Sequence, residues 1–214
     1  ESALDAYELL MAEDLFKAGM LAQKLEKRNQ ERQEITRRLQ VEAEQIALRM
    51  DPDPLLMFAV HPDFNPGVVG LVASRLTEQY YRPAIVAHQG PEFTRASCRS
   101  ITEFHITNAL DECAELLEHH GGHAAAAGFT VRNENLSELI HRLKQIAQRD
   151  LATLNLHPTL YADVEISLSE LKPELLNYLD WLQPTGMENR QPLFVSRSLK
   201  VRSARCVGKD NSHL

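Results

Sequence analysis

Apolar residues recur at roughly helical spacing along residues 2–49, which contain no proline and a single glycine, Gly19. This spacing predicts one long helix, or two helices that meet near Gly19. Beyond Leu25 the apolar positions become sparse, and charged residues dominate positions 24–34. A helix with so narrow an apolar stripe makes a poor domain by itself, so we interpret residues 1–50 as an exposed connector.

A strand, a helix and a second strand are predicted next. Pro52 and Pro54 end the long helix, because proline cannot continue a helix and restricts the residue before it. Continuous apolar runs at residues 55–60 and 84–87 predict buried strands, and residues 68–79 between them predict a helix. Continuous apolar strands joined by a helix are typical of an α/β fold.

The α/β pattern continues to about residue 155. We expect a strand at residues 97–101, a helix at 107–119, a glycine-rich turn at 121–123, a small-residue helix or strand at 124–131, and an amphipathic helix at 136–151. A strand at residues 160–166, a short helix at 169–182 and a strand at 193–206 follow. The predicted organisation is a connector helix (1–50), an α/β domain (51–155) and a third, β-containing domain (156–214).

The composition is that of a globular protein, with 214 residues, 43% hydrophobic, 25% charged and a formal net charge of −7. That charge argues against a protein that coats nucleic acid over its whole surface, but it leaves a local basic groove open. A basic cluster does occur near the C-terminal end, comprising Arg190, Arg197, Lys200, Arg202, Arg205 and Lys209. Three widely spaced cysteines without a CxxC pair predict reduced thiols, and no signal peptide or membrane-length apolar run is present. We expect a cytoplasmic protein without membrane association.

The candidate chemistry lies between residues 94 and 131. Residues 96–100 (ASCRS) and 121–128 (GGHAAAAG) are two clusters rich in small residues, and each contains a cationic or titratable side chain. Arginine, serine and backbone N–H groups all bind phosphate oxygens, and paired glycines let a backbone approach a ligand closely. The two clusters together predict an anion site.

Catalytic motifs are otherwise missing from the sequence, which contains no HExxH, P-loop or GxSxG pattern. His119 and His120 could contribute to a zinc site with Cys113 and His105, but no second ligand pair has the required spacing. We favour a helix end with surface histidines at those two positions. His123 stands within the glycine-rich frame, where an imidazole can donate to a phosphate oxygen or hold a leaving group.

The ordered motifs resemble the RecJ family of single-strand-specific 5′→3′ exonucleases, in the Asp-His-His (DHH) phosphoesterase superfamily. The matching segments are residues 67–76 (GVVGLVASRL), 82–83 (RP), 97–101 (SCRSI), 121–123 (GGH), 126–128 (AAG), 182–194 (LQPTGMENRQPLF) and 208–214 (GKDNSHL). The resemblance implies that residues 1–50 connect to an upstream catalytic domain. It implies that residues 51–155 are the DHH-associated domain, and that residues 156–214 begin an oligonucleotide-binding (OB) β-barrel.

The resemblance also implies roles for individual residues. Ser97 and Arg99 would contact the terminal phosphate of the strand, Ser100 would support their turn, and His123 would serve catalysis by facing the metal site and the scissile phosphate. The full set of implied phosphate- or nucleic-acid-binding residues is Asn65, Ser97, Arg99, Ser100, Gly121, Gly122, Arg190, Arg197, Lys200, Arg202 and Lys209. Three positions depart from the family pattern: Asn65 replaces a frequent histidine, Cys98 a small residue, and Glu188 the second glycine of a turn.

The family's Mn²⁺ or Mg²⁺ is bound by an N-terminal DHH domain, so the resemblance implies no metal ligands in this chain and no activity by the chain alone. The implied partners are single-stranded DNA, the DHH domain in the same polypeptide, and a single-strand-binding protein or helicase. Two alternatives stay open. One is a phosphodiesterase for short oligoribonucleotides or cyclic dinucleotides, and the other is a non-catalytic interaction module of a repair or replication assembly.

Overall fold

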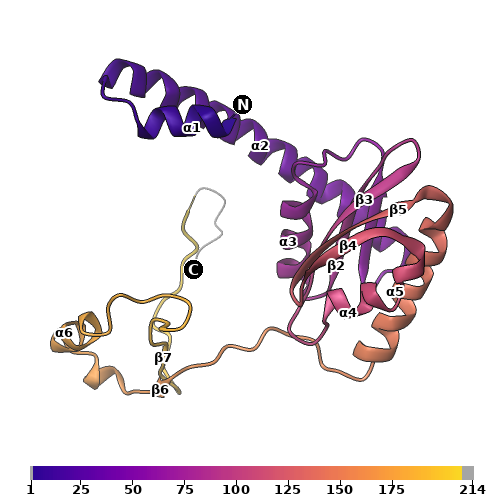
Figure 1. Ribbon diagram of the computed structural model, residues 1–214. Helices are drawn as coiled ribbons and strands as arrows, with labels where there is room; N and C mark the ends of the chain where they lie inside the picture. The colour runs from indigo at the N-terminus through magenta and orange to yellow at the C-terminus, as the bar shows by residue number, and fades with distance from the viewer. Residues whose placement is uncertain (1, 209–214) are drawn as a thin grey trace. The chain divides into compact units, whose positions relative to one another are not determined.

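The computed structural model describes residues 2–208, which form two compact units that divide after His157. Figure 1 shows the first unit as a helical hairpin that leads into a sheet with helices on both faces. The second unit contains only short elements. The predicted α/β class with a long N-terminal helix is confirmed.

The N-terminal region is a helical hairpin rather than one uninterrupted helix. Helix α1 spans Ser2–Leu10 and helix α2 spans Leu15–Met50, with Asp14 accepting a hydrogen bond from the Phe16 backbone N–H (2.9 Å). An aspartate at this position satisfies one of the free N–H groups at a helix start, so α2 begins here. A break near Gly19 is therefore wrong, because Gly19 lies inside α2.

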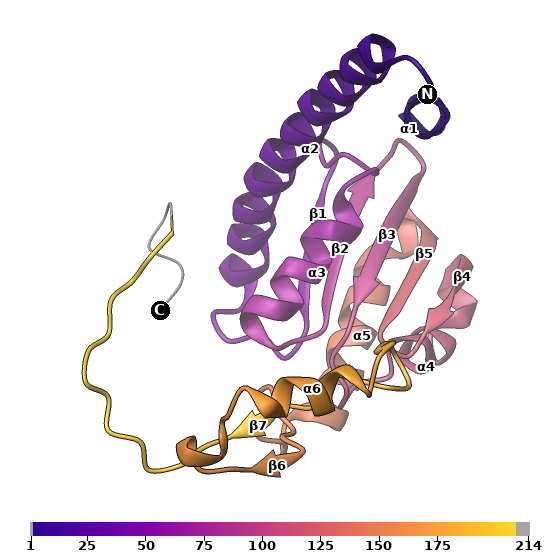
Figure 2. The same ribbon diagram turned by 90° about the vertical axis from the view of Figure 1, so that its left-hand side faces the viewer.

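A five-stranded mixed sheet with strand order β1-β2-β3-β5-β4 forms the centre of the first unit. Its strands are β1 (Met57–His61), β2 (Ala84–Gln89), β3 (Phe93–Arg99), β4 (Leu117–His123) and β5 (Ala126–Arg132). Strands β1 and β2 are parallel, whereas every other pair is antiparallel. Figure 2 shows α2 running alongside α3 and the β1–β2 side of this sheet.

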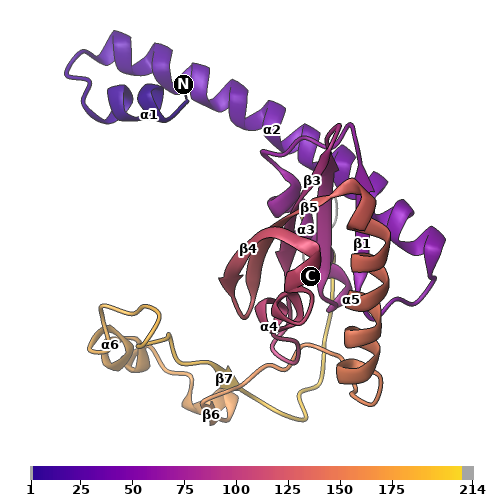
Figure 3. The same cartoon turned by 45° about the vertical axis from the view of Figure 1, so that its right-hand side comes forward.

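Each face of the sheet has its own buried apolar cluster. On one face, helices α4 (Ile106–Asp111) and α5 (Leu136–Leu151) pack against residues of β1, β2, β3 and β5 and against Leu117 at the start of β4. Figure 3 shows these two helices on that side of the sheet. On the other face, α2 and α3 (Val69–Tyr80) pack against residues of β1 and β2 only. The α3 face of the remaining strands therefore has no apolar cover in this cluster.

The region between α4 and α5 differs from the sequence prediction. The expected helix at 107–119 is wrong, because α4 ends at Asp111, a 3-10 turn follows at Ala114–Leu116, and β4 begins at Leu117. The expected inward residues do face the core: Ala109, Leu110 and Cys113 are buried, and Leu116 and Leu117 pack against them. Apolar spacing alone could not separate these states, since pairing with β5 overrides helix propensity. Residues 124–131, left open as helix or strand, mostly belong to β5.

The second unit contains two two-residue strands, β6 (Val164–Glu165) and β7 (Phe194–Val195), paired in parallel. A 3-10 turn (Leu168–Glu170) and α6 (Glu174–Asp180) lie between them. The strands expected at 160–166 and 193–206 and the helix expected at 169–182 are therefore much shorter than predicted. Over residues 158–208 no side chain is buried and no closed barrel is formed, so little apolar packing is present to extend these strands.

Candidate functional site

Three polar side chains of β3 lie on the face of the sheet that carries α3. Side chains alternate between the two faces of a strand, so Arg95, Ser97 and Arg99 share one face while Ala96 and Cys98 share the other. Ala96 and Cys98 are buried in the cluster under α4 and α5. A Cβ added to Gly70 of α3 would lie 3.4 Å from Arg99 Nη2 and 3.5 Å from Ser97 Oγ. The first turn of α3 thus contacts Ser97 and Arg99 directly.

The strand register brings the two sequence clusters together. Arg99 pairs with Ala126 of β5, which pairs with His123 of β4. Ser97 lies in the neighbouring row, opposite Gly128, which pairs with Gly121. Neighbouring strands are about 4.8 Å apart, so the backbones of Arg99 and His123 are separated by roughly 10 Å, with only an alanine between them.

The α3 face of β3, β5 and β4 is an open surface, which we call the open face. His119, Gly121 and His123 are exposed on β4, and Ala126 and Gly128 on β5 are too small to fill the space above the sheet. A flat floor of small residues with cations at its edges lets an extended, negatively charged chain approach the backbone. The chemistry of this face suits a phosphate-bearing ligand.

Arg99 is held in place without being neutralised. Its Nη1 donates to the carbonyl of Cys98 (2.8 Å), and its side chain is half-buried beside α3. Among residues 2–208 no carboxylate forms an ion pair with it. A guanidinium has five donors, so most of them stay available to a ligand. An oriented, unpaired arginine is well suited to grip phosphate oxygens with its planar fork.

Ser100 supports the loop instead of facing the open surface. Its hydroxyl donates to the carbonyl of Phe104 (2.6 Å), and its backbone N–H donates to the carbonyl of Ala125 (2.9 Å). Thr107 Oγ1 donates to the carbonyl of His123 (2.9 Å). These bonds tie the β4–β5 hairpin to the end of β3 and so fix His123 relative to Arg99.

Residues 121–123 form the end of strand β4, so the glycine-rich turn predicted there is wrong. The two-residue turn lies at 124–125. Gly122 has φ +148°, and an added Cβ would lie 2.3 Å from the carbonyl oxygen of Ala126. Gly121 has nothing within 4 Å of an added Cβ. The backbone of the β4–β5 hairpin requires glycine at position 122. Gly121 has no side chain and therefore leaves the space above the open face unfilled.

Asn65 lies in the loop that leads into α3. Its Oδ1 accepts a hydrogen bond from the backbone N–H of Gly67 (2.8 Å), and its side chain is exposed. This bond is an Asx turn that shapes the loop. The hydrogen bond of the Asn65 side chain stays within this loop, so Asn65 lies at the approach to α3 and outside the Arg99–His123 row.

His119 and His120 do not end a helix, so the interpretation as a helix end is wrong. They lie on β4 and point to opposite faces of the sheet. His120 Nε2 lies 2.8 Å from Asp111 Oδ1 on the α4 side, while His119 is exposed in the same row as Arg95 on the open face. Arg95 was not among the predicted site residues, and His119 was considered only as a possible zinc ligand. The period-2 alternation of residues 93–99 could have identified Arg95.

The basic residues of the second unit lie mostly on chain without regular structure. Arg190, Lys200 and Arg202 are exposed, and Arg197 Nε lies 3.1 Å from Glu165 Oε2. This pairing partly neutralises Arg197, although an exposed pair contributes little to stability. Lys209 lies outside the described residues. Within residues 158–208 these side chains form no hydrogen bond or ion pair with one another.

The histidines of the open face do not suit Mg²⁺ or Mn²⁺. Over residues 2–208 no group of three or more His, Cys, Asp or Glu side chains is placed to hold a metal ion. Both ions prefer oxygen ligands, whereas the open face around His123 offers imidazole nitrogens beside guanidinium groups, which are cations and do not ligate a metal. Within the same range, no helix is both long and apolar enough to cross a membrane.

Comparisons with known proteins identify two domain families. The DHHA1 domain model matches residues 53–149, and the RecJ OB domain model matches residues 162–214. The single-stranded-DNA-specific exonuclease RecJ of Bacillus subtilis is 33% identical over the whole chain, which covers 28% of that protein. RecJ of Dickeya dadantii is 34% identical over 94% of the chain, which covers 36% of that protein. The chain thus spans about a third of the length of the curated relatives it matches.

Solved structures agree with the sequence matches. The crystal structure of Thermus thermophilus RecJ with Mg²⁺ superimposes with a TM-score of 0.75 at 28% identity, covering 90% of this chain and 30% of that one. Its Mn²⁺ complex gives a TM-score of 0.76 at 27% identity, covering 91% and 28%. The chain belongs to the RecJ family and is homologous to the part of those proteins that carries the DHHA1 and RecJ OB domains.

Proposed function

We propose that this chain forms the phosphate-holding wall of the active cleft of a longer 5′→3′ exonuclease for single-stranded DNA. The observation that carries the proposal is the Arg99–Ala126–His123 row, in which an oriented, unpaired guanidinium faces an exposed imidazole across a low floor. The curated relatives are named single-stranded-DNA-specific exonucleases, which agrees with such a ligand.

The two sides of the row have different tasks in this proposal. Arg99 and Ser97 bind the terminal phosphate, with Gly70 leaving room for both side chains beside α3. His123 faces the next phosphate and can donate a proton or a hydrogen bond to it. Ser100 and Thr107 act indirectly, since their bonds hold the hairpin in register.

The catalytic metal belongs to the opposite wall. RecJ of Thermus thermophilus was solved with Mg²⁺ and with Mn²⁺, and such an ion would activate the attacking water. We assign the ion to an upstream DHH domain in the same polypeptide, so this chain alone should not cleave DNA. The exposed cations at Arg190, Lys200 and Arg202 would add electrostatic attraction for the rest of the strand. A single-strand-binding protein or a helicase would be a partner of the whole enzyme.

Binding by the 214-residue chain tests the phosphate wall. We compare a 5′-phosphorylated thymidine oligonucleotide with its 5′-hydroxyl form by fluorescence anisotropy, using Arg99→Gln and the control Arg38→Gln. Arg38 is exposed on α2, so its substitution removes the same charge far from the open face. Losing charge-assisted hydrogen bonds should weaken binding of the phosphorylated strand by about 10- to 100-fold for Arg99→Gln only. Equal affinity of both strand forms, or equal effects of both variants, would contradict the proposal.

Cleavage tests the catalytic part separately. In the longer protein with its upstream domain, His123→Asn should lower the rate of 5′→3′ degradation much more than it lowers binding. Absence of single-strand degradation by that protein with Mn²⁺ present would favour a non-catalytic interaction module. The alternative of a phosphodiesterase for short oligoribonucleotides or cyclic dinucleotides is disfavoured by the RecJ OB match at residues 162–214.

A further inference from the structure

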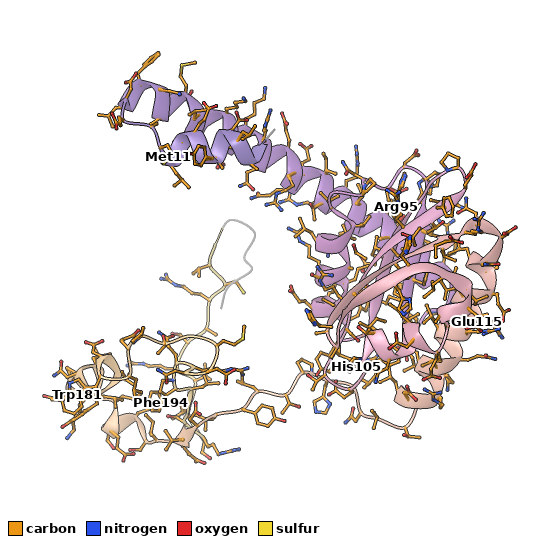
Figure 4. All side chains as sticks on the ribbon, viewed as in Figure 1. Met11, Arg95, His105, Glu115, Trp181 and Phe194 are labelled. Carbon is orange, nitrogen blue, oxygen red and sulfur yellow. The ribbon has the colours of Figure 1, made fainter. Side chains whose placement is uncertain are left out.

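A cavity of about 430 Å³ lies at the β2–β3 hairpin, toward the start of β3 and away from the Arg99–His123 row. Its lining includes Pro66 from the loop before α3, His88 from β2, and Phe93 and Arg95 from β3. Figure 4 labels Arg95 on this part of the first unit. The sequence analysis assigned no role to any of these four side chains, and the proposed phosphate wall does not use them.

The cavity continues the open face along β3. Phe93 and Arg95 lie on the same side of β3 as Ser97 and Arg99. This side of the strand therefore presents an aromatic ring, a cation, a hydroxyl group and a second cation, in that order. Arg95 lies two residues from Ser97, a separation of about 6.8 Å along the strand. A ligand held at Ser97 can therefore reach the cavity without leaving the sheet surface.

The lining combines flat apolar surfaces with a cation. Pro66, Pro91 and Phe93 supply apolar walls, and the half-buried Phe93 ring already holds the Arg132 guanidinium 5.1 Å from its centroid. Arg95 is exposed and has no ion pair among the described residues, although Glu92 also lines the cavity. Aromatic surfaces beside unpaired cations are what single-stranded nucleic acid binds, through base stacking and phosphate contacts.

His88 adds an unsatisfied polar atom at the same place. It pairs with Arg95 across the β2–β3 ladder, and its Nδ1 is buried without a hydrogen-bond partner among the described residues. A buried polar atom without a hydrogen-bond partner costs free energy in the folded protein. Binding of a ligand group that forms a hydrogen bond with the reoriented His88 ring would therefore be favoured. The base edge of a nucleotide carries such donors and acceptors.

We propose that this cavity is a nucleobase subsite, with the base against Phe93 and His88 and an adjoining phosphate on Arg95. The inference rests on the proposed function, because it places a nucleotide of the same strand next to the phosphate wall. Stacking of a base is sequence-tolerant, so the subsite would add affinity without selecting a sequence.

Abasic scanning of the bound strand tests the subsite. The 214-residue chain is titrated with a series of 5′-phosphorylated thymidine oligonucleotides in which one abasic nucleotide moves along the strand. In the unaltered chain, one position near the phosphorylated end should lose at least about fivefold in affinity, because its base no longer stacks. In Phe93→Leu that positional loss should fall to less than twofold, because the stacking surface is gone, while Arg38→Gln should keep it. Arg95→Gln should weaken binding of every strand in the series, because one phosphate contact is lost. Arg95 is exposed, so its variant tests the site even where Phe93→Leu disturbs folding.

The outcomes separate the two proposals. If Arg99→Gln weakens binding but a folded Phe93→Leu keeps the abasic profile of the unaltered chain, or Arg95→Gln binds the strands as the unaltered chain does, the nucleobase subsite is wrong and the phosphate wall stands. If neither Arg99→Gln nor Arg95→Gln changes affinity, the strand does not bind the open face and both proposals are overturned.

Discussion

The two halves of the α3 face share one sheet but have opposite surfaces. Over β1 and β2 the side chains are apolar, and α2 and α3 cover them so closely that Val72 is fully buried and Leu76 is 1% exposed. Over β3, β5 and β4 the side chains are mostly small or polar; those of β4 are exposed, while Phe93, Ser97 and Arg99 of β3 are half-buried. Strand pairing is continuous across both halves, so the size and polarity of the side chains distinguish the covered half from the open half.

The largest effect should come from opening the covered half. Leu76→Ala removes a fully packed side chain under α2 and leaves a cavity, so it should lower the free energy of unfolding by about 2–5 kcal/mol. Leu71→Ala is the matched control on the same helix, because Leu71 is 40% exposed, and it should change stability by less than about 0.5 kcal/mol. Urea denaturation measures both. Equal losses of stability in the two variants would mean that the two sides of α3 do not differ in burial.

The next effect contrasts the two glycines of β4. Gly122→Ala forces a side chain onto a positive-φ backbone and into the Ala126 carbonyl, so it should destabilise the unit by about 1–3 kcal/mol or more. Gly121→Ala adds a methyl group to open space and should leave stability nearly unchanged. Thermal unfolding of the two variants checks this. A stable Gly122→Ala protein would show that the hairpin can be rebuilt without its glycine.

A smaller effect on stability is expected at Gly70, where α3 meets β3 beside the open face. Gly70→Ala places a methyl group at ordinary contact distance from Arg99 and Ser97, and it should stabilise α3 by about 0.5–1 kcal/mol through helix propensity. Gly70→Leu should instead displace the Arg99 side chain and weaken binding of a 5′-phosphorylated strand. Unfolding curves and anisotropy titrations separate the two changes. Unchanged binding in Gly70→Leu would place the phosphate away from α3.

The smallest effect on stability near neutral pH concerns Cys98. It lies between Ser97 and Arg99 in the chain but points to the face of the sheet that α4 and α5 cover. Burial raises the pKa of its thiol to about 12, so the thiol stays protonated and unreactive in the folded protein. The unfolded thiol ionises near pH 9, so folding stability should fall only as pH rises from there toward 12. At pH 8 a thiol reagent should label the exposed Cys206 quickly and Cys98 only after unfolding. Rapid labelling of Cys98 would contradict its burial.

Local pattern identified some elements well and misread others for a definable reason. The apolar strands at 55–60 and 84–87 and the helix at 136–151 match β1, β2 and α5 closely, because each has one clear periodicity. Residues 107–119 also have helical spacing, yet residues from Leu117 onward pair with β5. Residues 93–99 alternate with a period of two, and Arg95 falls on the polar side of that alternation. His119 was instead assigned to the end of the helix expected at 107–119, whereas it lies on β4.

The amino-acid sequence by itself determined the α/β class, the long N-terminal helix and the family to which the chain belongs. Its two small-residue clusters predicted an anion site, and the family resemblance singled out Ser97, Arg99 and His123 within them. Only the tertiary structure decided that Arg99 and His123 share a row, because strand register depends on pairing between segments distant in the chain. The same register turned Cys98 inward and Arg95 outward. Side-chain direction is set by which face of the sheet the helices cover, and that is decided when the layers pack.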